Sequence, residues 1–246
     1  MLFMPILAAQ DNSLPPVNRA VIDAVRSMPS GGGYSTSPAA NRALSGAVSR
    51  EGSLLSVHTA EAVPSYCSGA TYLVFLKVLS DLQNSGRLTL TPETIAALRP
   101  AGQPDGTGIW GRWNANGPGT ARLFHELSLG PNFTSLSAAR PGDFLKIFWN
   151  DGIGASEHGH SVIFLGQDTK AGTLTFWSSN IPGGYGTKTV PLQRIHRLLF
   201  SRLEHPENLN RPLLLRTDAY LFSLQRRSSN SEEMARQCGL GNESRR

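Results

Sequence analysis

The chain has 246 residues, 39% of them hydrophobic and 17% charged, and its formal net charge is +5 at pH 7. This composition excludes a charged disordered chain and suits one large domain or two small ones. It contains no run of 18 apolar residues, so we expect no insertion into a membrane. The basic charge favours polyanions. Basic and aromatic residues do not interleave as they do on nucleic-acid-binding surfaces, however, so we expect no nucleic-acid partner.

The first part of the chain predicts helices. Apolar residues recur at helical spacing over 15–29, and "AANRALSGAV" has a weaker pattern of the same kind. Residues 68–84 are apolar on nearly every side, which is typical of a central buried helix. The segments "TPETIAALRP", which begins with a capping threonine, and "ARLFHELSLG" predict two shorter helices.

From residue 141 the pattern changes to that of strands. The predicted strands are "GDFLKIFW", "HSVIFLG", "TLTFWSSN" and, as a fourth, "RIHRLLFSRL". Helices followed by neighbouring strands predict an α+β fold with an antiparallel sheet. We expect one domain over 1–246, with an N-terminal helical segment at 1–50, a catalytic core at about 51–205 and an extension with a polar tail at 206–246.

Residues 102–120 are rich in glycine and asparagine but carry Trp110 and Trp113. Large aromatic side chains in a mobile polar loop are expected to line a cleft rather than a core. We therefore predict that Trp110, Trp113 and the neighbouring Asn114 form a wall of the substrate cleft.

The two cysteines, Cys67 and Cys238, are too few for a disulfide framework or a multi-cysteine zinc site. Cys67 stands at the predicted start of the buried helix, where free N–H groups and the helix dipole stabilise a thiolate. The alternative is a small buried hydrophobic residue. Cys238 lies in a polar segment that we interpret as a frayed end, so a bridge between the two cysteines is the less favoured reading.

A cysteine nucleophile needs a base, usually histidine. Six histidines compete for this role, and four of them are less favoured: His58, His125, His196 and His205. His160 begins an apolar strand, where its side chain is held by the sheet yet open to a cleft, and His158 has the same parity and is the second choice. The two histidines could also share a metal ion. Further metal ligands are not evident, so we expect no metal site.

The base needs a third group to orient it. In "LTFWSSN" the two-residue period puts Ser178 and Asn180 on the same side of the strand as Leu174 and Phe176. Asn180 has the reach and the carbonyl acceptor, with Ser178 as the alternative. The competing interpretation of Asn180 is a turn residue before "IPGGYG".

Four segments in order, "YCSGATYLVFL", "RPGDFLKIFW", "HSVIFLG" and "FWSSN", resemble the papain-like peptidoglycan amidases of the NlpC type. The chain differs in a longer insertion at 86–139 and in Tyr66, where the family often has aspartate. The resemblance implies a papain-like fold in which the helix carrying the cysteine packs on the sheet. It also implies Cys67 as nucleophile, His160 as general base and then acid, and Asn180 as orienter. The N–H of Cys67 and the Tyr66 hydroxyl would then stabilise the oxyanion, without any cofactor.

The start "MLFMPILAAQ" is too short for a signal peptide, so a protein acting outside the cytoplasm needs another export route. The missing signal peptide, the basic charge and the long insertion together resemble those of antibacterial amidase effectors delivered by type VI secretion. The resemblance implies action on peptidoglycan peptides in the periplasm of a target bacterium and an immunity protein as inhibitor.

Two other functions remain open on sequence grounds. One keeps the papain-like core but acts on a protein, as a protease, acyltransferase or deamidase. The other is a non-enzymatic module that holds a glycan or a partner protein through the Trp110 and Trp113 segment.

Overall fold

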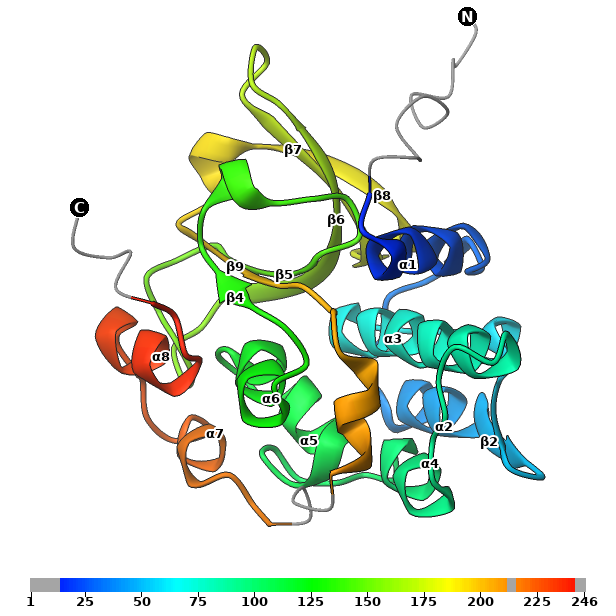
Figure 1. The fold of residues 1–246 in the computed structure, drawn as a ribbon. Coiled ribbons are helices and arrows are strands. Elements are labelled where there is room, and N and C mark those ends of the chain that lie inside the picture. Colours follow the sequence, from blue (N-terminus) through cyan, green and yellow to red (C-terminus); the bar gives the residue numbers. More distant parts are fainter. Residues whose placement is uncertain (1–13, 212–215, 242–246) are drawn as a thin grey trace, which may run out of the picture.

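The computed structural model describes residues 14–211 and 216–241, so the start "MLFMPILAAQ", which we expect to be no signal peptide, lies outside the described residues. The fold is α+β (Figure 1). The helices are α1 (Pro16–Arg26), α2 (Pro38–Gly46), α3 (Cys67–Asn84), α4 (Pro92–Leu98), α5 (Gly108–Asn114), α6 (Gly119–Leu127), α7 (Ala219–Ser223) and α8 (Ser231–Gln237). Short 3₁₀ turns are η2 (Thr59–Glu61), η3 (Leu136–Ala138), η4 (Leu192–Arg194) and η5 (Pro206–Asn210).

The main sheet is antiparallel and has seven strands within the described residues, in the order β1-β8-β7-β6-β5-β9-β4. Its strands are β1 (Gly31–Gly32), β4 (Asn132–Phe133), β5 (Phe144–Phe148), β6 (Gly159–Asp168), β7 (Thr173–Asn180), β8 (Gly184–Pro191) and β9 (Arg197–Ser201). A separate hairpin is formed by β2 (Val48–Glu51) and β3 (Leu54–Val57). The predicted α+β class with an antiparallel sheet is therefore confirmed.

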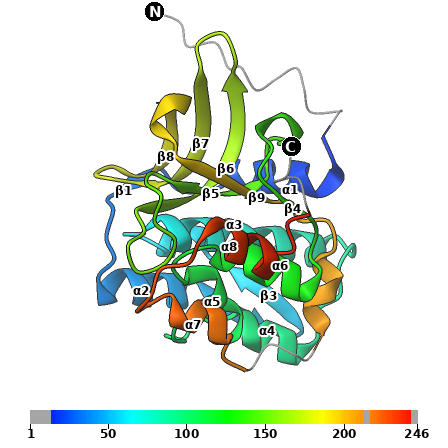
Figure 2. The ribbon, with the colours of Figure 1, turned by 90° about the vertical axis from the view of Figure 1, so that its left-hand side faces the viewer.

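The helix α3 is central, as its apolar sequence predicts. Leu73 through Leu76 are inaccessible to solvent, and α3 contacts α1, α2, α5, β3, β6 and β7. Figure 2 shows the sheet above and most of the helices below it, with α3 next to the sheet. Burial on every side leaves the helix little freedom to shift, so its first turn is held as a rigid platform.

The two faces of the sheet pack differently. Phe144, Ile163 and Trp177 face the α3 core, whereas Phe164, Phe176 and Phe200 belong to a second, smaller apolar cluster on the other side. Alternate residues of β5, β6 and β7 therefore enter different cores, as the two-residue period of a strand requires. Both faces of the middle of β6 are consequently fixed by packing.

The segment with two tryptophans contradicts our expectation of a mobile loop. Trp110 and Trp113 lie in α5 and are only 4% and 1% exposed. Trp113 stacks on Phe75 with ring centroids 4.8 Å apart and donates a hydrogen bond to the hydroxyl of Thr71. A Cβ at Gly111 would stand 2.1 Å from the carbonyl oxygen of Pro104. The glycine is thus needed for close packing of this helix rather than for flexibility.

The C-terminal segment also differs from the expected frayed end. Its residues form α8, which is capped by the Asn230 side chain accepting from the Glu233 N–H. Cys238 follows this helix and is 1% exposed. It packs in a cluster with Phe148, Ile153, Leu199 and Met234, so the tail is part of the folded structure up to at least this residue.

Candidate active site

Cys67 is the first residue of α3. Tyr66 precedes it in extended conformation, and no side chain of the described residues caps the helix. The first intrahelical bond of this turn runs from the Ala70 N–H to the Tyr66 carbonyl, so the N–H groups of residues 67–69 remain at the open end. A helix N-terminus of this kind favours negative charge. Cys67 is half-buried and its thiol lines a cleft.

The chain before Cys67 is tied to the sheet. The Ser179 hydroxyl on β7 donates to the Ser65 carbonyl at 2.9 Å, and the Tyr185 hydroxyl on β8 donates to the Ala62 carbonyl at 2.6 Å. These bonds hold the entrance to α3 against the same two strands that follow the His160 strand. The chain on the N-terminal side of Cys67 is therefore fixed relative to the sheet.

Pairing between β6 and β7 brings His160 and Asn180 together. Phe164 lies opposite Phe176, and the same register continued by four residues puts His160 opposite Asn180. The His160 Nε2 atom lies 3.1 Å from Asn180 Oδ1. The His160 ring also meets Phe176 edge to face, with centroids 5.6 Å apart. His160, chosen because it begins an apolar strand, and Asn180, chosen from strand parity, thus form one hydrogen-bonded pair.

The hydrogen bonds of Asn180 determine the tautomer of His160. Its Nδ2 atom donates to the carbonyl oxygens of Ser178 at 3.1 Å and Gly186 at 2.8 Å. The Oδ1 atom therefore faces His160 as an acceptor, and Nε2 of His160 carries the hydrogen and donates it. This arrangement leaves Nδ1 of His160 for the thiol, which is the role of an orienter in a catalytic triad.

The thiol of Cys67 has an acidic pKa despite its surroundings. Burial raises this pKa, but the hydrogen bond and charge of His160 outweigh it, with smaller contributions from the Ser161 N–H and the Lys146 ammonium. The resulting pKa of Cys67 is about 6, compared with about 8.5 for an ordinary cysteine. At neutral pH the thiolate is the main form, and the thiolate is the nucleophile.

Tyr34 belongs to the site and was not foreseen from the sequence. An isolated bridge pairs its backbone with Ser65, and its hydroxyl donates to Cys67 Sγ at 3.9 Å. Burial and the charge of Cys67 raise the pKa of the Tyr34 hydroxyl, so the group stays protonated and can donate. The only sequence signal was a large aromatic directly after three glycines in "GGGYS".

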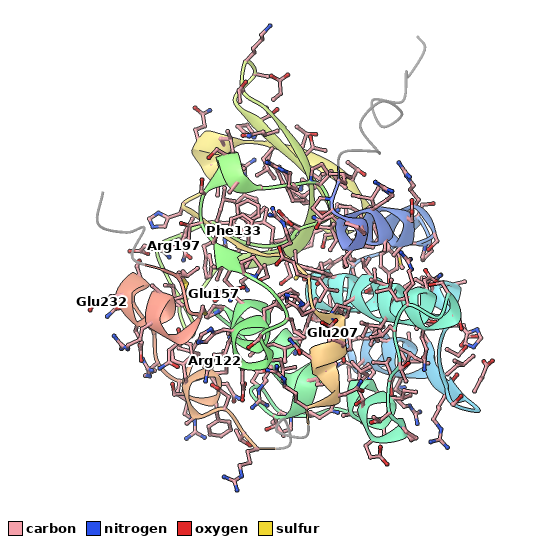
Figure 3. All side chains as sticks on the ribbon, in the orientation of Figure 1. Arg122, Phe133, Glu157, Arg197, Glu207 and Glu232 are labelled. Carbon is pink, nitrogen blue, oxygen red and sulfur yellow. The ribbon has the colours of Figure 1, made fainter. Side chains whose placement is uncertain are left out.

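The cleft at Cys67 has a volume of about 390 Å³. Its wall includes Lys146 and Glu157, which form an ion pair. Glu157, labelled in Figure 3, also accepts from the N–H groups of Gly117 and Gly154. Asp105 is half-buried in the same wall, and burial raises the pKa of its carboxyl group. Charged groups of both signs thus stand beside the thiol.

Three further residues predicted as alternatives or support for the site, Ser178, Tyr66 and His158, have other contacts. Ser178 is fully buried and donates to the Ser161 carbonyl, so it supports the strands rather than the histidine. The Tyr66 hydroxyl donates to Asn41 Oδ1, and the hydroxyl at the thiol is that of Tyr34 instead. His158 is exposed on the cleft wall.

The predicted cleft wall is right only in part. Asn114 lines the cleft at Cys67 as well as a neighbouring hollow, and Trp110 lines that hollow with its accessible edge. Trp113 is a core residue and does not line this cleft. The prediction of Trp113 as a cleft residue was therefore wrong.

Comparisons with protein-family models, curated proteins and solved structures give no match for this chain. Within residues 14–211 and 216–241, no three histidine, cysteine, aspartate or glutamate side chains gather as a metal site. In the same ranges, no helix has the length and apolar character needed to cross a bilayer. The chemistry of the site is accordingly argued from its own geometry.

Proposed function

We propose that this protein is a papain-like cysteine amidase or endopeptidase of the NlpC type that hydrolyses amide bonds in peptidoglycan peptides. The observation that carries the proposal is the position of Cys67 at the N-terminus of α3, hydrogen-bonded to His160, whose other nitrogen is held by Asn180. This arrangement lowers the pKa of the thiol to about 6. Enzymes that transfer acyl groups through a cysteine use a thiol of low pKa, often at a helix N-terminus, paired with an oriented imidazole. A cysteine that only fills space needs none of these partners.

In the first half of the proposed reaction, the Cys67 thiolate attacks the carbonyl carbon of the amide. A C–S bond forms and an electron pair moves to the carbonyl oxygen. The Cys67 N–H and the Tyr34 hydroxyl are the two donors near the sulfur that suit this oxyanion. The C–N bond then breaks while the proton on His160 Nδ1 moves to the leaving nitrogen, which gives a free amine and a thioester.

In the second half, neutral His160 takes a proton from water, and the hydroxide adds to the thioester carbonyl. Collapse of the adduct breaks the C–S bond, releases the carboxylic acid and restores the thiolate with protonated His160. Asn180 keeps the imidazole turned toward the sulfur in both halves. The cycle needs no group besides these side chains and water.

Peptidoglycan is the substrate that the sequence resemblance favours, because the ordered Cys-Ser-Gly, Pro-Gly-Asp, His-strand and Asn-strand segments cover residues 64–180. We further propose that the protein is an antibacterial effector delivered by type VI secretion, that it acts in the periplasm of the target, and that an immunity protein inhibits it there. A protein protease, acyltransferase or deamidase is the alternative that uses the same three residues.

A digestion of purified peptidoglycan tests the proposal. The intact protein is expected to release fragments with one new amine and one new carboxylate per cut, resolved by chromatography and mass spectrometry, and Cys67→Ala is expected to release none. Parallel incubations with protein substrates separate the alternative. Equal fragment release by the parent and Cys67→Ala would rule out the proposal.

The site of action is tested by directing the protein to either compartment of a test bacterium. Lysis is expected when the protein carries an export signal and not when it stays in the cytoplasm, and Cys67→Ala is expected to be harmless in both. Lysis from the cytoplasm alone would contradict a periplasmic target.

A further inference from the structure

Two hollows adjoin at the active site. The cleft at Cys67 adjoins a second hollow, which has a volume of about 540 Å³. Both hollows are lined by Asn41 on α2 and by Asn114 at the end of α5. The second hollow is also lined by Arg42, Gln103 and the edge of Trp110. We call the combined depression the amide groove. The two hollows together provide room for more of a substrate than the bond that Cys67 attacks.

The two shared asparagines are oriented by the neighbours of the nucleophile. The Tyr66 hydroxyl donates to Asn41 Oδ1, and the Ser68 hydroxyl donates to Asn114 Oδ1 at 2.7 Å. Each carboxamide therefore turns its oxygen toward the start of α3. Neither amide nitrogen donates to any of the described residues, so both NH₂ groups remain for a ligand.

Charge differs between the ends of the amide groove. The cleft at Cys67 contains the carboxyl groups of Asp105 and Glu157, and the latter is paired with Lys146. The second hollow contains the Arg42 guanidinium, and its lining has no carboxyl group among the described residues. A ligand carboxylate is therefore favoured in the second hollow and disfavoured beside Asp105.

We propose that the amide groove selects an acidic peptide: Asn41 and Asn114 donate to its carbonyl oxygens, and Arg42 binds its carboxylate beyond the scissile bond. The inference rests on the proposed function and names the substrate class of the same site. A carbonyl-rich chain matches two outward NH₂ groups, and a planar carboxylate matches the guanidinium fork. The three residues determine specificity, while Cys67, His160 and Asn180 carry the chemistry.

Binding measured in the Cys67→Ala background tests the inference without turnover. The probes are a stem tetrapeptide with a free carboxylate on its isoglutamate residue and the same peptide with that carboxylate amidated. We expect the free acid to bind more tightly, and Arg42→Gln to weaken its binding about 5–10-fold, since an exposed ion pair contributes modestly. The amidated peptide is expected to change less than twofold. Arg50→Gln, an exposed arginine that lines neither hollow, is the matched control.

Asn114→Asp and Asn41→Asp isolate the amide donors. Each aspartate still accepts the hydroxyl of Ser68 or Tyr66, so the local hydrogen bond is retained while the NH₂ group is lost. Both changes are expected to weaken binding of both peptides about tenfold or more. Asn84→Asp, on α3 away from the amide groove, is the control for an added charge.

The outcomes separate this inference from the proposed function. Equal binding of the two peptides, or an equal loss of both in Arg42→Gln, overturns the inference even if the parent cuts peptidoglycan. Selective binding without any cleavage by the parent supports the inference and removes the proposed hydrolysis. Unchanged binding in both asparagine variants overturns the role of the amides.

Discussion

Cys67 lies at the N-terminal end of a helix and Cys238 at the C-terminal end of another, and the pKa values of the two thiols are shifted in opposite directions. Cys67 opens α3, and its pKa is about 6 because His160, Ser161 and Lys146 outweigh the effect of burial. Cys238 follows α8, and burial raises its pKa to about 12. The comparison shows that burial alone disfavours a thiolate, and that hydrogen-bond donors and positive charge at the sulfur decide which thiol is reactive.

The surroundings of Cys238 explain why it stays a thiol. Its neighbours are apolar, among them Phe148 and Met234. Arg122, labelled in Figure 3, lowers the pKa of Cys238, but its charge is shared in an ion pair with Asp218, which acts in the opposite direction. The helix that precedes Cys238 presents its carbonyl end, which does not favour an anion. This residue is accordingly a packing residue.

Exchanging each cysteine for alanine is expected to give the largest contrast in activity. Cys67→Ala removes the proposed nucleophile, and kcat/KM for peptide release is expected to fall about 10⁴-fold or more. Cys238→Ala leaves the site untouched, so activity should stay within about twofold, with a loss of stability on the order of 1 kcal/mol from the small cavity. A Cys238→Ala variant that folds but is inactive would contradict the assignment of roles.

Replacing His160 is expected to make Cys67 more like Cys238. His160→Ala removes the proposed general base, which is also the main partner of the thiolate, and a loss of about 10²–10⁴-fold in kcat is expected. The pH at which half of Cys67 reacts with iodoacetamide should move upward at the same time. His158→Ala, at an exposed position just before the strand that carries His160, is the control and should change neither quantity.

Tyr34 provides a test of oxyanion stabilisation. Tyr34→Phe keeps the ring but removes the hydroxyl that donates toward Cys67, and kcat is expected to fall about 10²-fold, with little change in KM. Tyr66→Phe is the matched control for hydroxyl loss, because that hydroxyl donates to Asn41 and not to the thiol. If the Tyr66 variant lost kcat and the Tyr34 variant did not, the oxyanion donors would have to be reassigned.

The two thiols are also expected to affect stability in opposite pH ranges. The folded pKa of Cys67 is depressed, so its stabilising contribution is full above the unfolded value near 8.5 and is lost as the pH falls toward about 6. The folded pKa of Cys238 is raised, so its contribution is full below the unfolded value and is lost as the pH rises toward about 12. Urea unfolding of the parent and each alanine variant measures the differences, expected to be on the order of a few kcal/mol, since one pKa unit corresponds to about 1.4 kcal/mol. Parallel curves for all three proteins would contradict this coupling.

Much of the site follows from the sequence because it depends on local periodicity. The apolar run after Cys67 predicts a buried helix, and His160 is favoured because it begins an apolar strand. The two-residue period puts Asn180 on the same side of its strand as Phe176. The role of Tyr34 could not be found this way, since it depends on a bridge to Ser65, a pairing far apart in the chain that has no periodic pattern.

The helices α5 and α8 do not follow from our reading of the sequence, for different physical reasons. The glycine-rich sequence of α5 predicts a loop, because the close approach of Gly111 to Pro104 is a tertiary requirement that the sequence does not reveal. For α8 a local signal was present: Asn230 followed three residues later by Glu233 is a capping pattern. The polar composition of the segment hid this signal, and with it the burial of Cys238.

Labelling of the intact parent protein with iodoacetamide as a function of pH tests the reactivity of Cys67 most directly. The extent at each cysteine is read by peptide mass spectrometry. Cys67 is expected to react with a midpoint at about pH 6, and its thiolate fraction at pH 7 should exceed that of Cys238 by about 10⁴-fold or more, given the pKa of Cys238 near 12. Urea-unfolded protein should label both equally. A Cys67 midpoint near 8.5, or similar rates at the two cysteines in the folded protein, would contradict an activated nucleophile at the start of α3.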